Sequence, residues 1–495
     1  MQLKWQKRSY KWGNFMELST IFIWMHTFFG YFIIFYMILI IGIYSSMLIF
    51  AYFYMKKGLR LDKIADNDKS LKMIYSKPVS IIVPAYNEEL GVIDTIHSLL
   101  TLEYPQFEII VVNDGSKDGT LQTVIDHFKM RQVHRTIKRD LSTKEVRGIY
   151  ESDLHPNIVL VDKVNGGKAD ALNVGINISL YPYFCSIDGD SILSTTSLLR
   201  VMQPIISSND DVIAAGGSVR IANGADVQMG TVVDSVIPNN PFVIMQIIEY
   251  LRAFYMGRIA LSKFNLVLII SGAFSVFSKK WVIKAGGYSV NTIGEDMELV
   301  VKLHRYMLDH KLKKRIEFVP DPVCWTEAPD NLQDLRTQRR RWHQGLLGSL
   351  MIHKKMTFNP KYKQIGLISF PYFWLVEFFG PIIELLGYLY IIISFMAGEL
   401  YIDSAIILTT LFLVYSTFLS MFAILLEAWS INTYPRIRDV FKLIGFSLSE
   451  TFWFRPLTIF FRLEGIIYYL RKREDWGQLK RRGLSKKEEE SKQAV

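Results

Sequence analysis

Residues 183–190 have the sequence YFCSIDGD, in which a short β-rich run ends in Asp188 and Asp190. Such a run, closed by glycine and aspartate, is typical of a buried strand that stops at a turn. Three similar runs precede it, each followed by a loop and an amphipathic helical pattern: Val79–Val83, Phe107–Val112 and Asn157–Asp162. Repeated alternation of strand and helix predicts a parallel, doubly wound α/β sheet within residues 56–363.

Polar side chains follow each of these strands, at the edge where a parallel sheet binds ligands. In chain order they are Tyr86 and Glu88, then Asp114, then Lys168, then Asp188 and Asp190. Each ending alone is as compatible with a turn as with a functional loop, because sequences such as Asn-Asp-Gly are common in turns. Such endings on successive strands of one sheet favour a ligand site.

The pair Asp188 and Asp190 has the clearest chemistry. Two carboxylates separated by one residue can hold a hard divalent cation and leave its other positions to phosphate oxygens. Mg²⁺ or Mn²⁺ would there neutralise charge on a departing diphosphate. Asp114 suits hydrogen bonding to a uracil or ribose, and Lys168 offers a compact positive charge for the diphosphate. A solvated turn is the alternative, and the apolar strand before Asp188 weakens it.

Further motifs follow in residues 266–308. Leu266–Ile270 is predicted to be a strand, and Gly272 just after it allows a ligand to approach the backbone closely. Asp296 lies at the start of a predicted helix from Glu295 to about Leu308, where the helix dipole also favours a carboxylate. Asp296 is therefore either a helix cap or a general base that removes a proton from a sugar hydroxyl.

Gln338, Arg341 and Trp342 belong to the helical sequence QRRRW and share one face, since they are spaced i, i+3 and i+4. Arg341 can fork onto phosphate oxygens, and the indole of Trp342 can stack on a sugar ring. Arg339 and Arg340 are expected to point elsewhere, toward lipid headgroups. The alternative is a basic helix that only lies on a membrane surface.

Composition and charge distribution indicate a membrane protein. Half of the 495 residues are hydrophobic and 21% are charged, which excludes a mainly disordered chain. The net charge is +10. The basic residues cluster beside apolar runs and form no nucleic-acid-binding motif, so we expect no nucleic-acid partner. Basic residues beside an apolar run mark the cytosolic side of a membrane. The two cysteines, Cys185 and Cys324, cannot form a disulfide framework.

The membrane segments are predicted from runs without charge. Ser19–Met55 contains no charged residue and is expected to form an interfacial helix to about His26, then one span from about Phe28 to Met55, with a tight hairpin as the alternative. Two further apolar runs, Ile365–Ala397 and Ala405–Leu426, flank an acidic outside loop. Residues 439–470 are expected to form a re-entrant or interfacial hairpin.

Glu377 and Glu384 interrupt the first of the C-terminal apolar runs. They are seven residues apart and so lie on one helix face. Carboxylates in apolar segments usually face a bundle interior or a water-filled path. A structural pairing with Arg455 and a role in a lumen are therefore both open.

The chain divides into five predicted parts. They are an interfacial helix and span (1–56), a cytosolic domain (57–330), interfacial helices carrying the QRRRW motif (331–363), transmembrane and re-entrant helices (364–471) and a basic cytosolic tail (472–495).

This ordered set of motifs resembles the membrane-embedded family 2 glycosyltransferases, which include cellulose, hyaluronan and poly-N-acetylglucosamine synthases. The resemblance covers about residues 78–350 and rests on Pro84–Glu89, Asp114, Asp188–Asp190, Gly294–Asp296 and Gln338–Trp342. It implies a glycosyltransferase A-type α/β domain at the cytosolic face of the cell membrane, in a multi-pass protein whose helices form a polymer channel. It also implies inverting, metal-dependent transfer from a UDP-sugar to a growing β-linked polysaccharide, with room for an accessory membrane subunit.

The resemblance also assigns roles by residue. Asp296 is the implied catalytic base, and Asp188 and Asp190 are the implied ligands of Mg²⁺ or Mn²⁺. Nucleotide-sugar binding is implied for Tyr86, Glu88, Asp114, Lys168, Asp188, Gln338 and Arg341, and acceptor binding for Gly272, Glu295 and Trp342.

Departures from the family pattern narrow the choice of product. Gly294 replaces the usual threonine before the Glu-Asp pair, which is expected to alter acceptor contacts and not the base. A Phe-x-Val-Thr-x-Lys gating segment does not occur, which argues against a cellulose-type enzyme. Trp476-Gly477 and the basic residues after it resemble the tail of hyaluronan-type synthases.

The layout as a whole resembles the bacterial poly-β-1,6-N-acetylglucosamine synthases, so UDP-GlcNAc is the favoured donor. Hyaluronan- or cellulose-like synthesis and single transfer to a lipid carrier remain alternatives. A transporter or scaffold that only binds nucleotides would leave Asp296 and Trp342 without a role.

Overall fold

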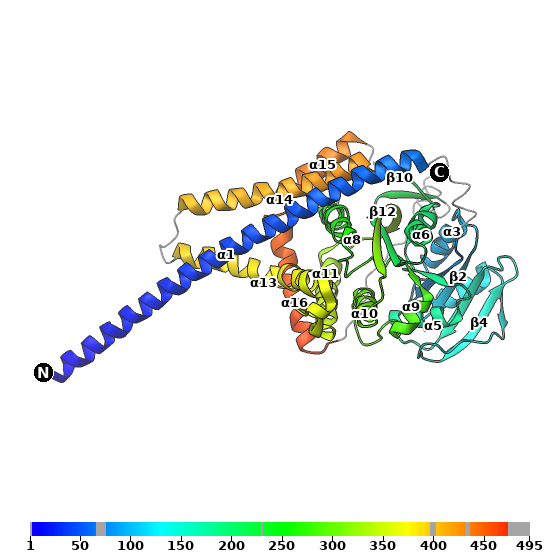
Figure 1. The fold of residues 1–495 in the computed structure, drawn as a ribbon, viewed down its shortest axis with the longest axis horizontal. Helices are drawn as coiled ribbons and strands as arrows, with labels where there is room; N and C mark the ends of the chain where they lie inside the picture. Colours follow the sequence, from blue (N-terminus) through cyan, green and yellow to red (C-terminus); the bar gives the residue numbers. More distant parts are fainter. Residues whose placement is uncertain (1, 66–75, 229–230, 397–401, 431–435, 474–495) are drawn as a thin grey trace, which may run out of the picture.

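The computed structural model describes residues 2–65, 76–228, 231–396, 402–430 and 436–473. A ten-stranded sheet covered by helices forms one end of the molecule, and long apolar helices extend away from it at the other (Figure 1). The strand order is β3-β4-β5-β2-β1-β6-β11-β8-β12-β7. The strands are β1 (Val79–Ala85), β2 (Phe107–Asn113), β3 (Met130–Val133), β4 (Val146–Ser152), β5 (Ile158–Lys163), β6 (Tyr183–Ile187), β7 (Ile192–Leu193), β8 (Val212–Ile221), β11 (Phe274–Ser278) and β12 (Arg315–Thr326); β9 (Ala225–Gln228) and β10 (Thr231–Ser235) form a separate hairpin.

The four strands predicted from the sequence form the parallel centre of the sheet, as β5, β2, β1 and β6. Each is followed by a helix, as the alternation of patterns predicted. These helices are α3 (Val92–Leu100), α4 (Thr120–His127), α5 (Lys168–Ile178) and α6 (Ser197–Ser207). The sheet as a whole is mixed, because β4 and β11 pair antiparallel to the outer strands of this group.

Successive side chains of a strand point to opposite faces of the sheet. Both of these faces are buried by helices. Ile81 packs into one apolar cluster with helices α3, α6 and α7 (Pro241–Arg252). Ile82 packs into a second cluster with α5, α9 (Lys279–Ala285) and α10 (Glu295–Asp309). Burial on both faces fixes the register of the central strands and holds their carboxyl ends along one edge.

The predicted strand Leu266–Ile270 is wrong. In the structure these residues connect α8 (Ile259–Lys263) to β11 without joining the sheet. Leu266 and Leu268 pack into a cluster under the membrane-proximal helices, whereas Val267 and Ile270 pack under the sheet. Two backbone carbonyl groups of this segment form hydrogen bonds with side chains. The Ser369 hydroxyl group donates to the carbonyl oxygen of Leu266, and the His304 ring forms a hydrogen bond with that of Val267. The alternating apolar pattern thus reflects burial between two clusters.

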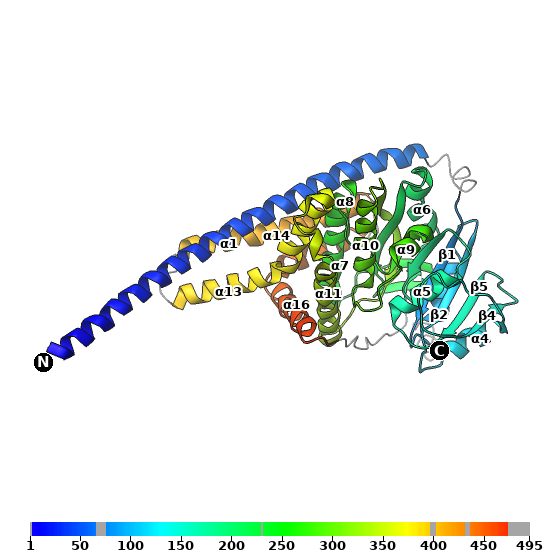
Figure 2. The same ribbon diagram turned by 60° about the horizontal axis from the view of Figure 1, so that its bottom comes forward.

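A single helix, α1 (Gln2–Ala65), runs along the molecule in both views (Figure 2). The predicted interfacial helix and span therefore form one continuous helix, and the alternative hairpin does not occur. Residues Trp24–Lys57 of α1 are long and apolar enough to cross a membrane, and so are Leu413–Ser430 of α14 (Ile402–Ser430). A third candidate is bent by 42° and combines Ile365–Phe378 with α13 (Gly380–Met396). Helix α1 packs against both α13 and α14.

The C-terminal region continues with two shorter helices, α15 (Ile437–Ser449) and α16 (Phe454–Leu470), within the predicted hairpin. Helix α16 packs along α11 (Leu332–Ile352), which carries the QRRRW motif. The motif residues Trp476 and Gly477 lie outside the described residues.

Candidate active site

A cavity of about 2300 Å³ begins at the carboxyl edge of the parallel strands and continues between the apolar helices. Its walls come from the strand ends, α7, α10 and α11, and then from α1, α13, α14 and α16. Every site residue predicted from the sequence lines this cavity: Tyr86, Glu88, Asp114, Lys168, Asp188, Asp190, Gly272, Glu295, Asp296, Gln338, Arg341 and Trp342. Residues from separate motifs are thus brought to one space.

Asp114 lies at the end of β2 and is held by the loop that follows β5. Its carboxylate accepts hydrogen bonds from the backbone N–H groups of Gly166 and Gly167, at 2.9 and 2.7 Å, and from the Lys163 ammonium. A carboxylate has about four acceptor positions, so one remains for a ligand. Sequence reasoning missed Lys163, which is fully buried and also pairs with Asp170 at 2.7 Å.

Lys168 begins α5 and connects two of the predicted carboxylates. Its Nζ lies 2.5 Å from Oδ1 of Asp188 and 3.4 Å from Oε1 of Glu295. Burial acts to lower the pKa of Lys168, but the nearby carboxylates outweigh it and raise that pKa. Burial raises the pKa of Glu295, and the charge of Lys168 offsets part of the effect. One fixed positive charge therefore lies between the end of β6 and the start of α10.

The donor set at Asp188 and Asp190 fits a divalent cation that is completed by substrate. Both carboxylates line the cavity, and no cluster of three or more metal-binding side chains occurs among the described residues. Mg²⁺ is commonly bound by one or two carboxylates together with phosphate oxygens and water. Asp188 and Asp190 match that pattern, with Lys168 as a second positive group beside them.

Asp296 lies at the second position of α10, and its Oδ1 accepts a hydrogen bond from the backbone N–H of Met297 at 2.7 Å. Gly272 approaches it closely. A Cβ built on Gly272 would lie 3.0 Å from Oδ2 of Asp296 and 3.2 Å from its Cβ. The absence of a side chain at Gly272 therefore leaves the space that the Asp296 carboxylate occupies.

We expect Gly272→Ala to reduce sugar transfer by about 10- to 100-fold, because small displacements of a reacting group have effects of that size. The added methyl group must push the Asp296 carboxylate away, since contacts of 3.0–3.2 Å are too tight to keep. Steady-state kinetics and UDP affinity would be measured together. Gly387→Ala is the control, because a Cβ on this cavity-lining glycine meets nothing within 4 Å. Full activity of Gly272→Ala would contradict this account.

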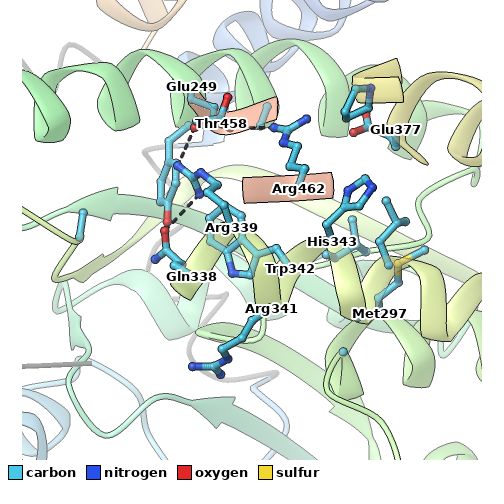
Figure 3. Close-up of a pocket in the computed structure, with 18 of the residues that line it drawn as sticks. Glu249, Met297, Gln338, Arg339, Arg341, Trp342, His343, Glu377, Thr458 and Arg462 are labelled. Atoms are coloured by element: carbon cyan, nitrogen blue, oxygen red, sulfur yellow. Dashed lines mark hydrogen bonds and ion pairs between the residues drawn. The ribbon is translucent and has the colours of Figure 1, made fainter. Parts of the chain in front are cut away.

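Helix α11 presents four residues of the QRRRW motif to the cavity, namely Gln338, Arg339, Arg341 and Trp342 (Figure 3). Oε1 of Gln338 accepts a hydrogen bond from Arg339 at 3.1 Å, which leaves the amide N–H groups of Gln338 as donors. Trp342 is 47% exposed, and the Arg339 guanidinium lies over its ring at 4.2 Å. In Figure 3 the Arg341 side chain points away from Gln338, Arg339 and Trp342. Burial lowers the pKa of Arg341, while the negative charges of Glu295 and Asp188 act to raise it.

The expectation that Arg339 and Arg340 point to lipid headgroups is wrong. Arg339 is buried and pairs with Glu249 of α7 at 2.6 Å. Arg340 is also buried, lies over the ring of Tyr468 at 4.2 Å and is 3.7 Å from Glu464 of α16. Both arginines attach α11 to neighbouring helices, because a buried charge is stable only when it is paired.

The unusual Gly294 has a structural reason. A Cβ built on Gly294 would lie 2.9 Å from the Cα of Gly345 in α11. A threonine at this position would collide with the backbone of that helix. The contact brings the start of α10, with Glu295 and Asp296, directly against the helix that carries Trp342.

Ion pairs line the cavity where it enters the apolar helices. Arg455 pairs with Glu384, so the structural pairing left open by the sequence is present. Both residues also line the cavity, so a role in a lumen stays a prediction. Arg252 forms a bidentate pair with Glu450, with N–O distances of 2.6 and 2.8 Å. Glu377 accepts a hydrogen bond from the hydroxyl group of Tyr372 at 2.8 Å.

Two family models match the chain. The model described as Glycosyl transferase family 2 matches residues 80–286. The model described as Glycosyl transferase family group 2 matches residues 186–431. Together they span most of the sheet, the predicted site and part of the apolar helices.

Curated relatives and solved structures agree with these matches. The poly-β-1,6-N-acetyl-D-glucosamine synthase of Staphylococcus epidermidis is 28% identical over 327 residues, which are 64% of this chain and 68% of the relative. The protein of the same name in Staphylococcus aureus is 27% identical over 294 residues, which are 59% of this chain and 60% of the relative. A mannosyltransferase of Pyrobaculum calidifontis, solved with GDP-mannose and Mn²⁺, has a TM-score of 0.54 at 16% identity and covers 89% of this chain and 99% of that one. The last likeness shows a shared glycosyltransferase A-type fold.

Proposed function

Because this chain belongs to glycosyltransferase family 2, we propose that it builds a β-linked polysaccharide from UDP-GlcNAc and passes it through its membrane helices. The observation that carries this proposal is the single cavity that contains Asp188 and Asp296 and continues between α1, α13 and α14. The relatives named as poly-β-1,6-N-acetyl-D-glucosamine synthases support the choice of donor sugar.

In this proposal the nucleotide binds at the strand ends. Asp114 keeps one acceptor position for a uracil or ribose group, and Tyr86 and Glu88 line the same part of the cavity at the end of β1. Lys168 and Arg341 would provide positive charge for the diphosphate, and both are close enough to Asp188 and Glu295 to interact with their charges.

The transfer itself depends on Asp296. Its carboxylate would remove the proton from the acceptor hydroxyl while that oxygen attacks the anomeric carbon from the face opposite UDP. An α-linked donor sugar then becomes a β-linked residue, and no covalent enzyme intermediate is required. Trp342 offers its exposed ring as a surface for the acceptor sugar, while Gln338 offers amide donors beside it.

Asp188 and Asp190 would hold a divalent cation together with phosphate oxygens of the donor. When bound, Mg²⁺ or Mn²⁺ supplies positive charge for the leaving diphosphate. The mannosyltransferase with the shared fold was solved with Mn²⁺, which supports a divalent metal of this class.

We place the catalytic end on the cytosolic side of the cell membrane in a multi-pass protein. Lys56 and Lys57 lie at the end of the apolar part of α1 that leads into the sheet domain, and such basic residues favour the cytosolic side. The acceptor polymer would then leave between the apolar helices, past the ion pair of Glu384 and Arg455.

The experiment uses the full chain in detergent or vesicles with Mg²⁺ or Mn²⁺, and measures UDP release and product mass. UDP-GlcNAc, UDP-glucose and UDP-glucuronate are offered separately and together, with Asp296→Asn as the inactive control. High-mass product from UDP-GlcNAc alone supports the proposal. A need for UDP-glucuronate as well would indicate a hyaluronan-like enzyme. Product from UDP-glucose alone would indicate a cellulose-like enzyme. Product that is only short or lipid-linked would indicate a single-transfer enzyme. UDP release no higher than in Asp296→Asn overturns the proposal.

Removal of divalent metal is expected to abolish transfer, and added Mg²⁺ or Mn²⁺ to restore it. Asp188→Asn should raise the metal concentration needed for half-maximal rate by about tenfold or more, because the cation loses one of two charged ligands. A metal titration of both proteins measures this effect. Undiminished UDP release in excess chelator would contradict the assignment of Asp188 and Asp190.

A further inference from the structure

Arg258 is a cavity-lining arginine that no motif predicted. It ends a π-helical segment, η2 (Ala253–Arg258), inserted between α7 and α8. Its guanidinium lies over the ring of Phe254 at 4.1 Å, and its Nη1 atom is buried without a hydrogen-bond partner. Short π-helical insertions are rare and occur frequently at functional sites.

The other arginines around it differ in one respect. Arg252, Arg339, Arg455 and Arg462 also line the cavity, and each forms an ion pair with a carboxylate. Among the described residues, Arg258 forms no ion pair or hydrogen bond through its side chain. Arg258 is only partly buried as a residue, but its Nη1 atom is buried, and a buried polar atom left without a hydrogen bond is costly. A ligand in the cavity would complete the hydrogen bonds of this atom.

Arg258 and Arg341 share one charged neighbour and differ in the others. Burial lowers the pKa of Arg258 to about 10, and the opposing charges are those of Asp296, Tyr250 and Glu377. The charged groups that act on Arg341 are Glu295, Asp188, Arg340 and Asp296. Asp296 therefore acts on both arginines, whereas Glu377 acts on Arg258 and Glu295 and Asp188 act on Arg341.

The surroundings of Arg258 favour a neutral ligand with a carbonyl oxygen. Glu377 contributes negative charge near Arg258, which disfavours an anionic sugar. Gly257 lines the cavity with open space beside it, since a Cβ built there meets nothing within 4 Å, and Leu261 adds apolar surface. A guanidinium donates several N–H groups in one plane, and an amide carbonyl next to a methyl group matches both features.

We propose that Arg258 is a positioning residue that binds the acetamido carbonyl oxygen of the acceptor sugar and so directs the acceptor hydroxyl toward Asp296. This inference rests on the proposed use of N-acetylglucosamine and adds to it the means by which the acceptor is recognised. It separates the two ends of the cavity: Arg341 serves the donor diphosphate and Arg258 serves the acceptor.

The test measures binding of two neutral trisaccharides to the full chain in detergent, with saturating UDP and Mg²⁺. One is β-1,6-linked N-acetylglucosamine, and the other is β-1,6-linked glucose, which lacks the acetamido groups. Wild-type protein should bind the first at least about tenfold more tightly, because a site built to hydrogen-bond a group rejects the analogue without it. Arg258→Met should lose that preference while its affinity for UDP stays unchanged. Arg258→Lys, which keeps the charge and one donor group, should retain part of it.

Each other outcome overturns the inference. Equal binding of the two trisaccharides by wild-type protein, or a preference that survives in Arg258→Met, means that Arg258 does not recognise the acetamido group. Weakened UDP affinity in Arg258→Met with an unchanged trisaccharide preference assigns Arg258 to the donor. Formation of polymer from UDP-GlcNAc by wild-type protein is scored separately, so a failure of the proposed function is distinguishable from a failure of this inference.

Discussion

Asp296→Asn is expected to lower the rate of sugar transfer by about 10²- to 10⁴-fold, the range associated with loss of a general base. Asparagine has the same size, and its amide oxygen can still accept the hydrogen bond from the backbone N–H of Met297. The close contact with Gly272 also remains possible. What the substitution removes is the proton-accepting role that we propose for the Asp296 carboxylate.

Transfer rate and UDP affinity would be measured on the same preparation. In the proposed mode UDP binds at the strand ends, around Asp114 and Lys168, so its affinity should stay within about twofold of wild type, a change worth less than 0.5 kcal/mol. Asp334→Asn provides a matched control, because Asp334 is a first-turn carboxylate of α11 that lines the same cavity. A rate for Asp296→Asn within tenfold of wild type would mean that another group accepts the proton.

The parallel centre of the sheet and the residues at its edge could be predicted because each signal is local. The strand that ends at Asp188 is a short β-rich run that stops at a turn, and the edge rule for parallel sheets then places Asp114 and Asp188 together. The antiparallel strand β11 could not be found in this way. Apolar residues just before it, Leu266–Ile270, have a strand-like pattern, yet they are buried between two clusters formed by distant helices.

The same limit applies to the helix α11. Helical spacing placed Gln338, Arg341 and Trp342 on one face, and all three line the cavity. The position of the Arg339 side chain depends on its ion pair with Glu249, a residue 90 positions away in sequence. Sequence alone does not reveal this long-range partner, so a basic residue next to an apolar region is expected to point to lipid. Arg258 has no local sequence signal for a similar reason, because it differs from its neighbours only in lacking the ion pair that they form.

The second large effect is expected from Gly387→Trp, which should stop polymer growth at short chains and leave the first transfers intact. Gly387 lies in α13 and lines the cavity, and a Cβ built on it meets no atom within 4 Å. An indole would fill that open space. If the product leaves between α1, α13 and α14, a growing chain then reaches an obstruction and remains in the acceptor position.

Product length and the time course of UDP release in vesicles report on this obstruction. A brief phase of UDP release followed by arrest, with only short product, is expected, and UDP affinity should be unchanged because Asp114 and Lys168 are untouched. Gly42→Trp is the matched control: Gly42 is an exposed residue of α1 that also has open space around it but does not line the cavity. Long product from Gly387→Trp would mean that the polymer takes another route. Equal arrest in both variants would show that a tryptophan disturbs these helices wherever it is placed, and the cavity would lose its support as the export path.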